Sequence, residues 1–412
     1  MKVVIASIVL PYPPMSGGAQ GIFSIIEELR HQHEVTFIFP VNGDNTMPAM
    51  HKLKKRWPEV DLRPYGYLRQ MCYPRFIIDK AKRAYGLHFK SGDSDFIVHR
   101  LLDHYGYYMT RDFSRFVNGI IAEKQPDLVQ VEFYPYLKVA DLLPAGFPKV
   151  FVHHEIRCVR NERFLQDFAL TEEQKQQSQA IAAEEVVDLN KYDAVIALTD
   201  NDRQTLRDMG VTVPLYTSPL AVSTSLLDHR PWQGDLFFVG GFSHTPNEEG
   251  MQWFLSQVAP LVKWPAGCRL NLIGKGWTEE WLRQYNSSAL TVKLHGFVER
   301  LDEVAAGCIM IVPILSGSGM RMKILEGAAL STPIITTTVG VEGIGLSHDV
   351  SCLVADTPKD FAEALQRMMQ SESLRYRLAR NARQTYDQHY SRQSVANIRQ
   401  QIWQQVVEHY KL

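Results

Sequence analysis

Two cations and one carboxylate follow a glycine- and serine-rich turn in the segment VPILSGSGMRMKILEGAALSTPII, residues 312–335. Arg321 and Lys323 stand two residues apart, and Glu326 follows three residues later. An arginine fork grips phosphate oxygens through two parallel hydrogen bonds, whereas a lysine acts as a compact point charge. A carboxylate one helical turn further on suits paired ribose hydroxyls. The spacing therefore favours a nucleoside diphosphate over a simple carboxylate ligand.

The backbone around these side chains favours the same ligand. The apolar run CIMIVPI, residues 308–314, predicts a strand that ends where the turn begins. Ligands of doubly wound sheets bind beyond the carboxyl ends of the strands. Gly317 and Gly319 let backbone N–H groups approach a ligand closely, and the helix formers that follow predict a helix N-terminus, which attracts anions. The alternative is an ordinary helix start whose arginine and lysine are solvated.

A second glycine-rich turn follows the first apolar run, in VLPYPPMSGGAQGIFSIIEEL. Gly17 and Gly18 open a predicted helix there. The spacing is not GxGxxG, and no acidic residue closes the next predicted strand, EVTFIF, so a nicotinamide site is disfavoured. A tight turn alone would explain the pair. A Gly-Gly turn that faces a second domain with a phosphate corner is better explained as part of a ligand site.

Two adjacent histidines, His153 and His154, close the predicted strand of VFVHHE. Neighbouring residues of a strand point to opposite faces, so only one of them can face a ligand. A hydrogen-bonded structural pair is the alternative. There is no HExxH motif. DxD triplets stand at Asp93–Asp95 and Asp200–Asp202. The second follows a strand and opens a helix, so capping explains it. The first lies in an irregular basic region, and we expect no metal site.

Short apolar runs alternate with helix-period segments along the whole chain, which indicates βαβ units around parallel sheets. Residues 219–234 have loop composition and predict the linker between two domains. The predicted strands are 2–9, 34–39, 126–133, 149–154, 193–198 and 213–218 before the linker, and 235–241, 269–274, 290–296, 308–314, 333–337 and 351–355 after it. The chain from residue 358 onward is predicted to be helical.

Composition excludes several classes of protein. The 412 residues carry a net charge of −1, which gives no sign of a nucleic-acid partner. Five scattered cysteines without a CxxC pair predict reduced thiols in a cytosolic protein and no zinc site. The apolar run Val3–Leu10 ends at prolines and predicts a first strand, not a signal peptide. No run approaches the ~20 apolar residues of a membrane span, so any membrane contact would be peripheral.

One segment, residues 63–115, combines ten Lys or Arg residues with five Asp or Glu residues and eleven aromatic residues. One interpretation is a helical excursion whose basic residues are solvated. The other is a basic and aromatic surface that touches anionic lipid headgroups or a polyanionic acceptor. The sequence does not separate the two.

Four stretches of the chain resemble GT-B glycosyltransferases, in particular the large retaining group called family 4. They are PPMSGGAQGIFSIIEELRHQHEVTFI, FVHHE, LFFVGGFSHTPNEEGMQWFLSQVAPLV and LHGFVERLDEVAAGCIMIVPILSGSGMRMKILEGAALSTPIITTTVGVEGI. The resemblance implies an α/β chain with two Rossmann-like doubly wound domains that face each other across a cleft. Residues 1–218 would be the acceptor-side domain and 219–391 the donor-binding domain, with the C-terminal helix 392–412 packed back on the first.

The same resemblance implies roles for single residues of the second domain. Arg321 and Lys323 would hold the donor diphosphate during catalysis, and Glu326 would bind the ribose. The backbone around Phe297 and Val298 would meet the base.

Further roles concern the glycines and the histidine. Gly241 and Gly319 would line the donor site, and the loop of Gly17 and Gly18 would close over the phosphates and acceptor. His154 matches the active-site histidine beside the donor sugar.

The chain also departs from the family pattern. Ser318 stands where a first glutamate is common, which leaves the donor sugar open. GGFSHTPN replaces a common basic residue. Asn247 in that stretch either caps a helix or touches the donor, and we expect the cap.

The resemblance implies metal-independent, retaining transfer of a sugar from a nucleotide-diphosphate donor to an acceptor hydroxyl, with no cofactor besides that substrate. A bacterial surface polysaccharide or lipopolysaccharide pathway is expected, with a glycan or lipid-linked acceptor and a cytoplasmic enzyme at the inner face of the membrane. Two alternatives remain. One is a GT-B sugar-nucleotide epimerase or hydrolase, and the other is a non-catalytic nucleotide-sugar-binding subunit.

Overall fold

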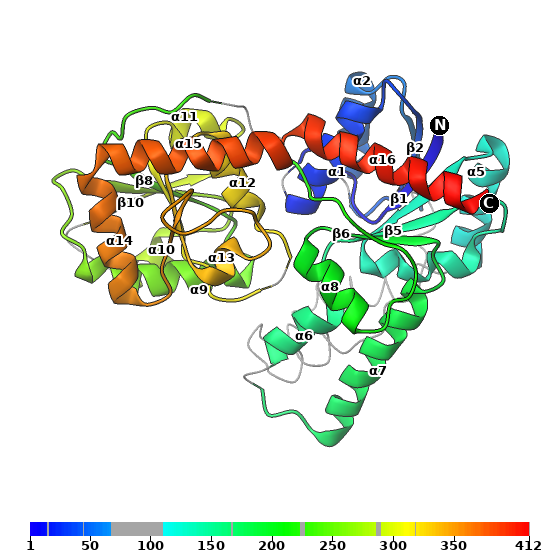
Figure 1. The fold of residues 1–412 in the computed structure, drawn as a ribbon, viewed down its shortest axis with the longest axis horizontal. Coiled ribbons are helices and arrows are strands. Elements are labelled where there is room, and N and C mark those ends of the chain that lie inside the picture. The colour runs from blue at the N-terminus through cyan, green and yellow to red at the C-terminus, as the bar shows by residue number, and fades with distance from the viewer. Residues whose placement is uncertain are drawn as a thin grey trace. The chain divides into compact units, whose positions relative to one another are not determined.

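A computed structural model describes the chain in eight ranges. These are residues 1–14, 16–43, 45–66, 110–165, 168–222, 227–285, 290–317 and 319–411. Most of the basic and aromatic segment 63–115 therefore lies outside the described residues, and neither interpretation of it is tested. The chain divides into two compact units (Figure 1). The first domain comprises residues 1–218 and 396–412, and the second comprises residues 219–395.

The described residues of the first domain form a seven-stranded sheet in the order β3-β2-β1-β4-β5-β6-β7, with every pair parallel. The strand order reverses between β1 and β4, which lie side by side. The strands are β1 (Lys2–Ser7), β2 (Glu34–Pro40), β3 (Asp61–Tyr65), β4 (Leu128–Glu132), β5 (Lys149–His153), β6 (Ala194–Ala197) and β7 (Leu215–Thr217).

Strand β3 was not among the predicted strands. Its sequence, DLRPY, carries two charged residues and a proline and has no apolar run. β3 lies at the edge of the sheet, with Pro64 opposite Phe39 of β2. A proline is tolerated at an edge because no further strand needs its missing N–H group.

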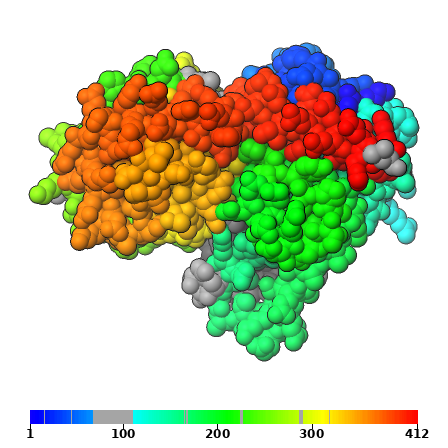
Figure 2. All heavy atoms as spheres, viewed as in Figure 1, coloured from blue at the N-terminus to red at the C-terminus, as the bar shows by residue number. Residues whose placement is uncertain are grey.

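Helices cover both faces of this sheet, as its parallel strands require. They are α1 (Gly17–Leu29), α2 (Thr46–Arg56), α5 (Arg111–Lys124), η2 (Tyr134–Leu142), α6 (Arg157–Leu165), α7 (Glu172–Leu189), α8 (Asp200–Asp208) and α16 (Arg392–Tyr410). In Figure 1, α7 projects away from the sheet with α6 beside it. The C-terminal residues of α16, red in Figure 2, lie along the surface of the first domain.

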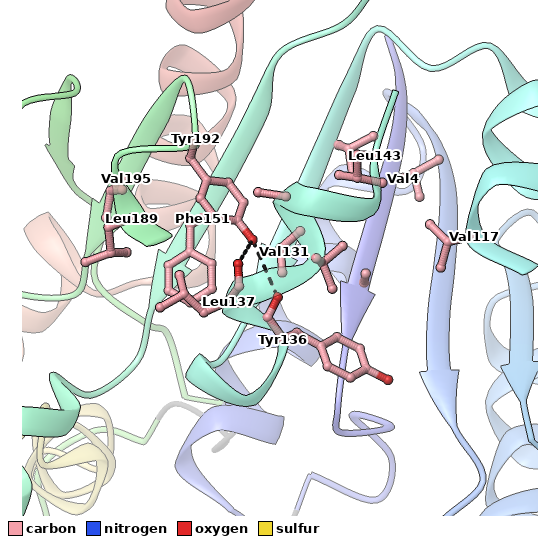
Figure 3. Close-up of a cluster of buried hydrophobic side chains, with 14 of the residues drawn as sticks. Val4, Val117, Val131, Tyr136, Leu137, Leu143, Phe151, Leu189, Tyr192 and Val195 are labelled. Carbon is pink, nitrogen blue, oxygen red and sulfur yellow. Dashed lines mark hydrogen bonds between the residues drawn. The ribbon is translucent and has the colours of Figure 1, made fainter. Parts of the chain in front are cut away.

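One face of the first sheet carries the main apolar core of the domain. Val131 of β4 and Phe151 of β5 point into it and meet Tyr136 and Leu137 of η2 (Figure 3). The hydroxyl of Tyr192 reaches in from the end of α7 and donates a hydrogen bond of 2.7 Å to the Leu137 carbonyl. Because side chains alternate along a strand, the neighbours of Val131 on β4 point to the opposite face.

The described residues of the second domain form a six-stranded parallel sheet in the order β10-β9-β8-β11-β12-β13. Its order reverses between β8 and β11. The strands are β8 (Leu236–Val239), β9 (Arg269–Ile273), β10 (Thr291–Gly296), β11 (Ile309–Val312), β12 (Ile334–Thr336) and β13 (Leu353–Val354). The helices are α9 (Thr245–Trp253), η3 (Phe254–Val258), η4 (Ala259–Leu261), α10 (Glu279–Leu282), η5 (Arg283–Tyr285), α11 (Leu301–Ala305), α12 (Met322–Ala329), α13 (Thr338–Val341), α14 (Pro358–Gln370) and α15 (Glu372–His389).

Glycine allows α9 to pack directly on the end of β11. A Cβ atom at Gly250 would overlap the carbonyl oxygen of Pro313, which follows β11. This close approach brings the first turn of α9 beside the loop that leads to α12. No helix in the described part of the chain is both long and apolar enough to cross a bilayer.

Candidate active site

The phosphate corner predicted from the sequence lies at the reversal of strand order in the second sheet. The loop after β8 carries Gly240 and Gly241, and the loop after the neighbouring β11 leads into α12. Ligands of doubly wound sheets bind at such a switch point, because the connections from the two adjacent strands leave in opposite directions. Gly317 and Gly319 have φ angles of 105° and 77°, which side chains other than glycine rarely adopt.

Arg321 occupies the N-cap position of α12 and is only 8% exposed. Its guanidinium donates a hydrogen bond to the Gly319 carbonyl, which holds the side chain against the loop. The helix N-terminus and the guanidinium thus place positive charge at one point.

Lys323, in the first turn of α12, extends its amine into the same corner. Nζ donates a hydrogen bond to Oδ1 of Asn247 and lies 4.6 Å from the centre of the Phe238 ring. Burial and the positive charge of Arg321 lower the pKa of Lys323 to about 7, although Glu326 opposes the shift. A bound anion would favour the charged lysine again.

Asn247 does not cap its helix, so the predicted cap is wrong. The N-cap of α9 is His244, and Asn247 lies inside the first turn. Its amide donates a hydrogen bond of 2.8 Å to the Gly241 carbonyl while its oxygen accepts from Lys323. A Cβ atom at Gly240 would lie 2.6 Å from the Asn247 amide nitrogen, so a side chain at this position would displace Asn247. Asn247 therefore links the loop after β8 to the cationic corner.

His244 was not singled out from the sequence, although it belongs to the GGFSHTPN stretch. Burial and the nearby charges of Lys323 and Arg321 lower its pKa. The His244 imidazole is therefore close enough to Arg321 and Lys323 for its pKa to change when an anion binds to them.

The remaining predicted donor residues lie at the same edge of the sheet. Glu326 is 8% exposed and lies in α12, one turn beyond Lys323. Phe297 follows β10 and is 47% exposed, with the Lys275 amine 5.4 Å from its ring centre. Val298 is its immediate neighbour. An exposed aromatic ring at this edge can stack on a planar group.

The first domain carries its own polar site at the reversal between β1 and β4. α1 begins at Gly17, and the Ser16 side chain caps it by accepting from the Ala19 N–H group. A Cβ atom at Gly18 would lie 2.6 Å from the Phe133 ring and 3.6 Å from Nδ1 of His154. Phe133 follows β4 with a φ angle of 70°, which is strained for this residue. Its ring stacks on His154 with centroids 3.8 Å apart.

The two adjacent histidines have different partners. Nε2 of His154 lies 2.5 Å from Oε2 of Glu132, the last residue of β4. Nε2 of His153 lies 2.9 Å from Oε1 of Glu185 in α7. Of the two, His154 is the one whose ring lies beside Gly18.

Glu185 explains why His153 is structural. Its carboxylate also accepts hydrogen bonds from the backbone N–H groups of Arg157 and Cys158, the first two residues of α6. Burial opposes ionisation, but the hydrogen bonds from His153 and these N–H groups outweigh it and lower the pKa of Glu185. His153 therefore fastens α7 and α6 to the end of β5.

Glu132 was missed from the sequence. A carboxylate that closes the buried run LVQVE at the carboxyl end of a strand is an unusual feature and could have been noted. The pairing of Glu132 with His154 could not have been predicted without the strand order, because Glu132 ends β4 and His154 follows the neighbouring strand β5. The Asp200–Asp202 triplet lies in the first turn of α8, which Thr199 caps. Within the described ranges, no three His, Cys, Asp or Glu side chains gather as metal ligands would.

Part of the chain, residues 233–371, is similar to a known family of proteins. These residues match the family model described as "Glycosyl transferases group 1". An uncharacterised 44.6 kDa protein in the cps region of Klebsiella pneumoniae is 28% identical over 137 residues, which is 31% of this chain and 35% of that protein. The matched region thus spans about a third of the curated relative.

Solved structures resemble the chain over almost its full length. Sucrose-phosphate synthase from Thermosynechococcus elongatus matches with a TM-score of 0.68 and 15% identity, covering 98% of this chain and 99% of that one. Anabaena Alr3699/HepE in complex with UDP-glucose matches with a TM-score of 0.63 and 14% identity, covering 98% and 99%. The likeness confirms the predicted two-domain α/β fold. The chain thus has the GT-B fold, and residues 233–371 of its second domain match the model of the glycosyl transferases group 1 family.

Proposed function

We propose that this protein transfers a sugar from a nucleotide-diphosphate donor to an acceptor hydroxyl. The observation that carries the proposal is the pair of cations Arg321 and Lys323, largely buried together at the switch point of the second sheet. Two neighbouring positive charges in a poorly hydrated corner oppose each other until an anion arrives. A diphosphate beside the N-terminus of α12 supplies that anion.

The same groups would assist the bond-breaking step. Negative charge develops on the leaving diphosphate as the glycosidic bond loosens. Arg321, Lys323 and the helix N-terminus are already oriented to stabilise it. We therefore propose that no metal ion is needed. Glu326 would accept hydrogen bonds from the ribose, and the exposed ring of Phe297 would stack on the base, with Val298, Gly241 and Gly319 lining the site.

The donor and pathway are proposed from the relatives. The Anabaena protein was solved in complex with UDP and with UDP-glucose, so a UDP-sugar is the first donor to test. The relative in a cps region favours a role in polysaccharide synthesis, with a glycan or lipid-linked acceptor. Retention of configuration follows from the family resemblance. Contact with the inner face of the membrane through 63–115 also stays a prediction.

A binding screen tests the donor site. Melting temperature is measured with UDP-, GDP- and ADP-linked sugars in the presence of EDTA, for the native protein, Arg321→Ala and Arg367→Ala. Arg367 is an exposed arginine on α14 of the same domain and serves as the matched control. We expect one nucleotide to raise the melting temperature of the native protein and the control, and not of Arg321→Ala. A folded protein that responds to none would contradict the proposed donor site.

Product analysis separates the alternatives. Transfer to an acceptor, followed by the anomeric configuration of the product, tests both transfer and retention. Release of free sugar or its epimer, with no transfer when acceptors are supplied, would instead indicate a hydrolase or epimerase. Binding without any turnover would indicate a non-catalytic subunit.

A further inference from the structure

A chain of buried polar side chains runs through the first domain to His154. Gln130 and Glu132 lie two residues apart on β4 and therefore share one face of the sheet, opposite the apolar core of Figure 3. They are 1% and 2% exposed. Buried polar groups of this kind must find hydrogen-bond partners. Here the partners come from α16 on one side and from His154 on the other.

The side chains of α16 set the direction of these hydrogen bonds. Nε1 of Trp403 lies 2.8 Å and Nη1 of Arg399 lies 3.3 Å from Oε1 of Gln130. Indole and guanidinium groups can only donate, so this Gln130 atom must be the oxygen. The NH₂ group of Gln130 consequently faces Glu132 and donates to its Oε1.

Glu132 receives the hydrogen bonds from both sides. Its Oε2 lies 2.5 Å from Nε2 of His154. The guanidinium of Arg399, which is 0% exposed, lies 3.9 Å from Oε1 and supplies the opposite charge. An ionised carboxylate can only accept, so Nε2 of His154 must carry the hydrogen.

The other ring nitrogen of His154 is left as an acceptor. In a neutral imidazole with Nε2–H, Nδ1 holds a lone pair. Nδ1 is the ring atom nearest to the Gly18 position at the start of α1. Stacking on Phe133, with 13° between the ring planes, fixes the orientation of the ring. Among the described residues, no hydrogen bond is made to Nδ1.

We propose that Glu132 is the positioning residue of His154: it holds the Nε2–H tautomer, so that Nδ1 accepts a hydrogen bond from a substrate hydroxyl beside Gly18. The catalytic part of this proposal rests on the proposed sugar transfer, because the hydroxyl belongs either to the donor sugar or to the acceptor. Gln130, Arg399 and Trp403 hold Glu132 in turn. A carboxylate that fixes the tautomer of an active-site imidazole is a general device of enzymes.

The first test uses the native protein labelled with ¹⁵N-histidine. The His154 signal is identified by its loss in His154→Gln, and its nitrogen shifts show which ring nitrogen carries hydrogen. We expect hydrogen on Nε2. Hydrogen on Nδ1 would overturn the proposal, and this measurement needs neither substrate nor a variant of Glu132.

The second test is Glu132→Gln. Gln130 still donates to the Oε1 position, so the new amide keeps its oxygen there and turns its NH₂ toward His154. That group donates to Nε2 and drives the hydrogen onto Nδ1. We expect this inversion in the ¹⁵N spectrum, together with a fall in kcat of at least about 10²-fold. We expect the donor KM to change by less than about threefold, because the donor phosphates are bound elsewhere.

Glu185→Gln is the matched control, since Glu185 and His153 form the same kind of pair on the opposite face. We expect it to lower the melting temperature and to leave the His154 signal and kcat near native values. The rate of donor hydrolysis without acceptor shows whether Nδ1 of His154 binds a hydroxyl of the donor sugar or of the acceptor. If the hydroxyl belongs to the donor sugar, hydrolysis slows in Glu132→Gln. If it belongs to the acceptor, hydrolysis keeps its native rate. An inverted tautomer with native kcat would refute the positioning role. A native enzyme without transferase activity but with the expected tautomer would refute the proposed function instead.

Discussion

Replacement of Lys323 by methionine should stabilise the unliganded protein while abolishing donor binding. The lysine amine lies over the Phe238 ring and near the positive charge of Arg321, where water cannot fully solvate it. Methionine has similar length and keeps the apolar contacts with the ring. It removes the charge and also the hydrogen bond to Asn247.

The magnitude follows from the pKa. Lowering it from 10.5 to about 7 corresponds to at most about 5 kcal/mol of unfolding free energy. The Lys323 side chain keeps some contact with water, and methionine loses a hydrogen bond worth about 1 kcal/mol. We therefore expect a net stabilisation of about 2–3 kcal/mol, or about 5–10 °C in melting temperature.

The sign of the pH dependence is the stricter test. Below pH 7, lysine is protonated in both the folded and unfolded states, so the folded protein bears the full penalty. Above pH 7 the folded state releases the proton, and the penalty disappears as pH approaches 10.5. The advantage of Lys323→Met should therefore be largest near about pH 6 and fall by about half near about pH 9.

Thermal unfolding across this range, with Lys263→Met as an exposed control in the same domain, measures the effect. The control should shift unfolding free energy by no more than about 0.5 kcal/mol. Burial and the charges of Lys323 and Arg321 also lower the pKa of His244, so this histidine adds its own pH dependence to the stability. The series is therefore repeated in a His244→Gln background, which removes that contribution. A destabilised Lys323→Met at acid pH, or an advantage independent of pH, would refute the argument that the amine is poorly solvated.

Three further predictions concern the two polar sites. Gly18→Ala should lower kcat by about tenfold or more, because its Cβ would press on the Phe133 ring that orients the histidine; native kinetics in a folded variant would contradict this. Asn247→Ala should weaken donor binding by about tenfold, since Lys323 and the Gly241 carbonyl both lose a partner, and calorimetry measures it. Donor binding near about pH 7.5 should take up protons at Lys323, seen as a binding enthalpy that changes with the ionisation enthalpy of the buffer; identical enthalpies in two buffers would argue against it.

Most strands were predictable because central parallel strands are buried on both faces and read as apolar runs. The run 308–314, for example, contains β11. β3 escaped because an edge strand needs no such run and tolerates a proline. The start of α9 also involves a proline: the helix begins at Thr245 and not after Asn247. Pro246 is favoured in the first turn, so the cap had to precede it and could not be Asn247.

The grouping of the charged side chains at the start of α12 was predictable because they are close in the sequence. Arg321, Lys323 and Glu326 lie within one loop and one helix turn, so spacing alone brings them together. The pair Glu132–His154 depends on β4 lying beside β5, and its support from Arg399 depends on where α16 packs. No local pattern encodes those neighbours, since the sheet order determines them.

Both polar sites lie where the strand order of a sheet reverses. This placement explains why the fold tolerates two unfavourable features, the strained backbone of Phe133 and the poorly solvated amine of Lys323. At β1/β4 and β8/β11 the connections leave the carboxyl ends in opposite directions, so no loop needs to pack over the gap. Strain at Phe133, about 1–3 kcal/mol, and the poorly solvated Lys323 therefore do not disrupt a core.

Under the proposed function a diphosphate restores the charge of Lys323, whereas His154 needs a hydroxyl to satisfy Nδ1. The second domain should thus gain stability from the donor phosphates, and the first should respond only to a sugar or acceptor. UDP alone should consequently raise the melting temperature without moving the His154 ¹⁵N signals, and movement of those signals by UDP would contradict this division of roles.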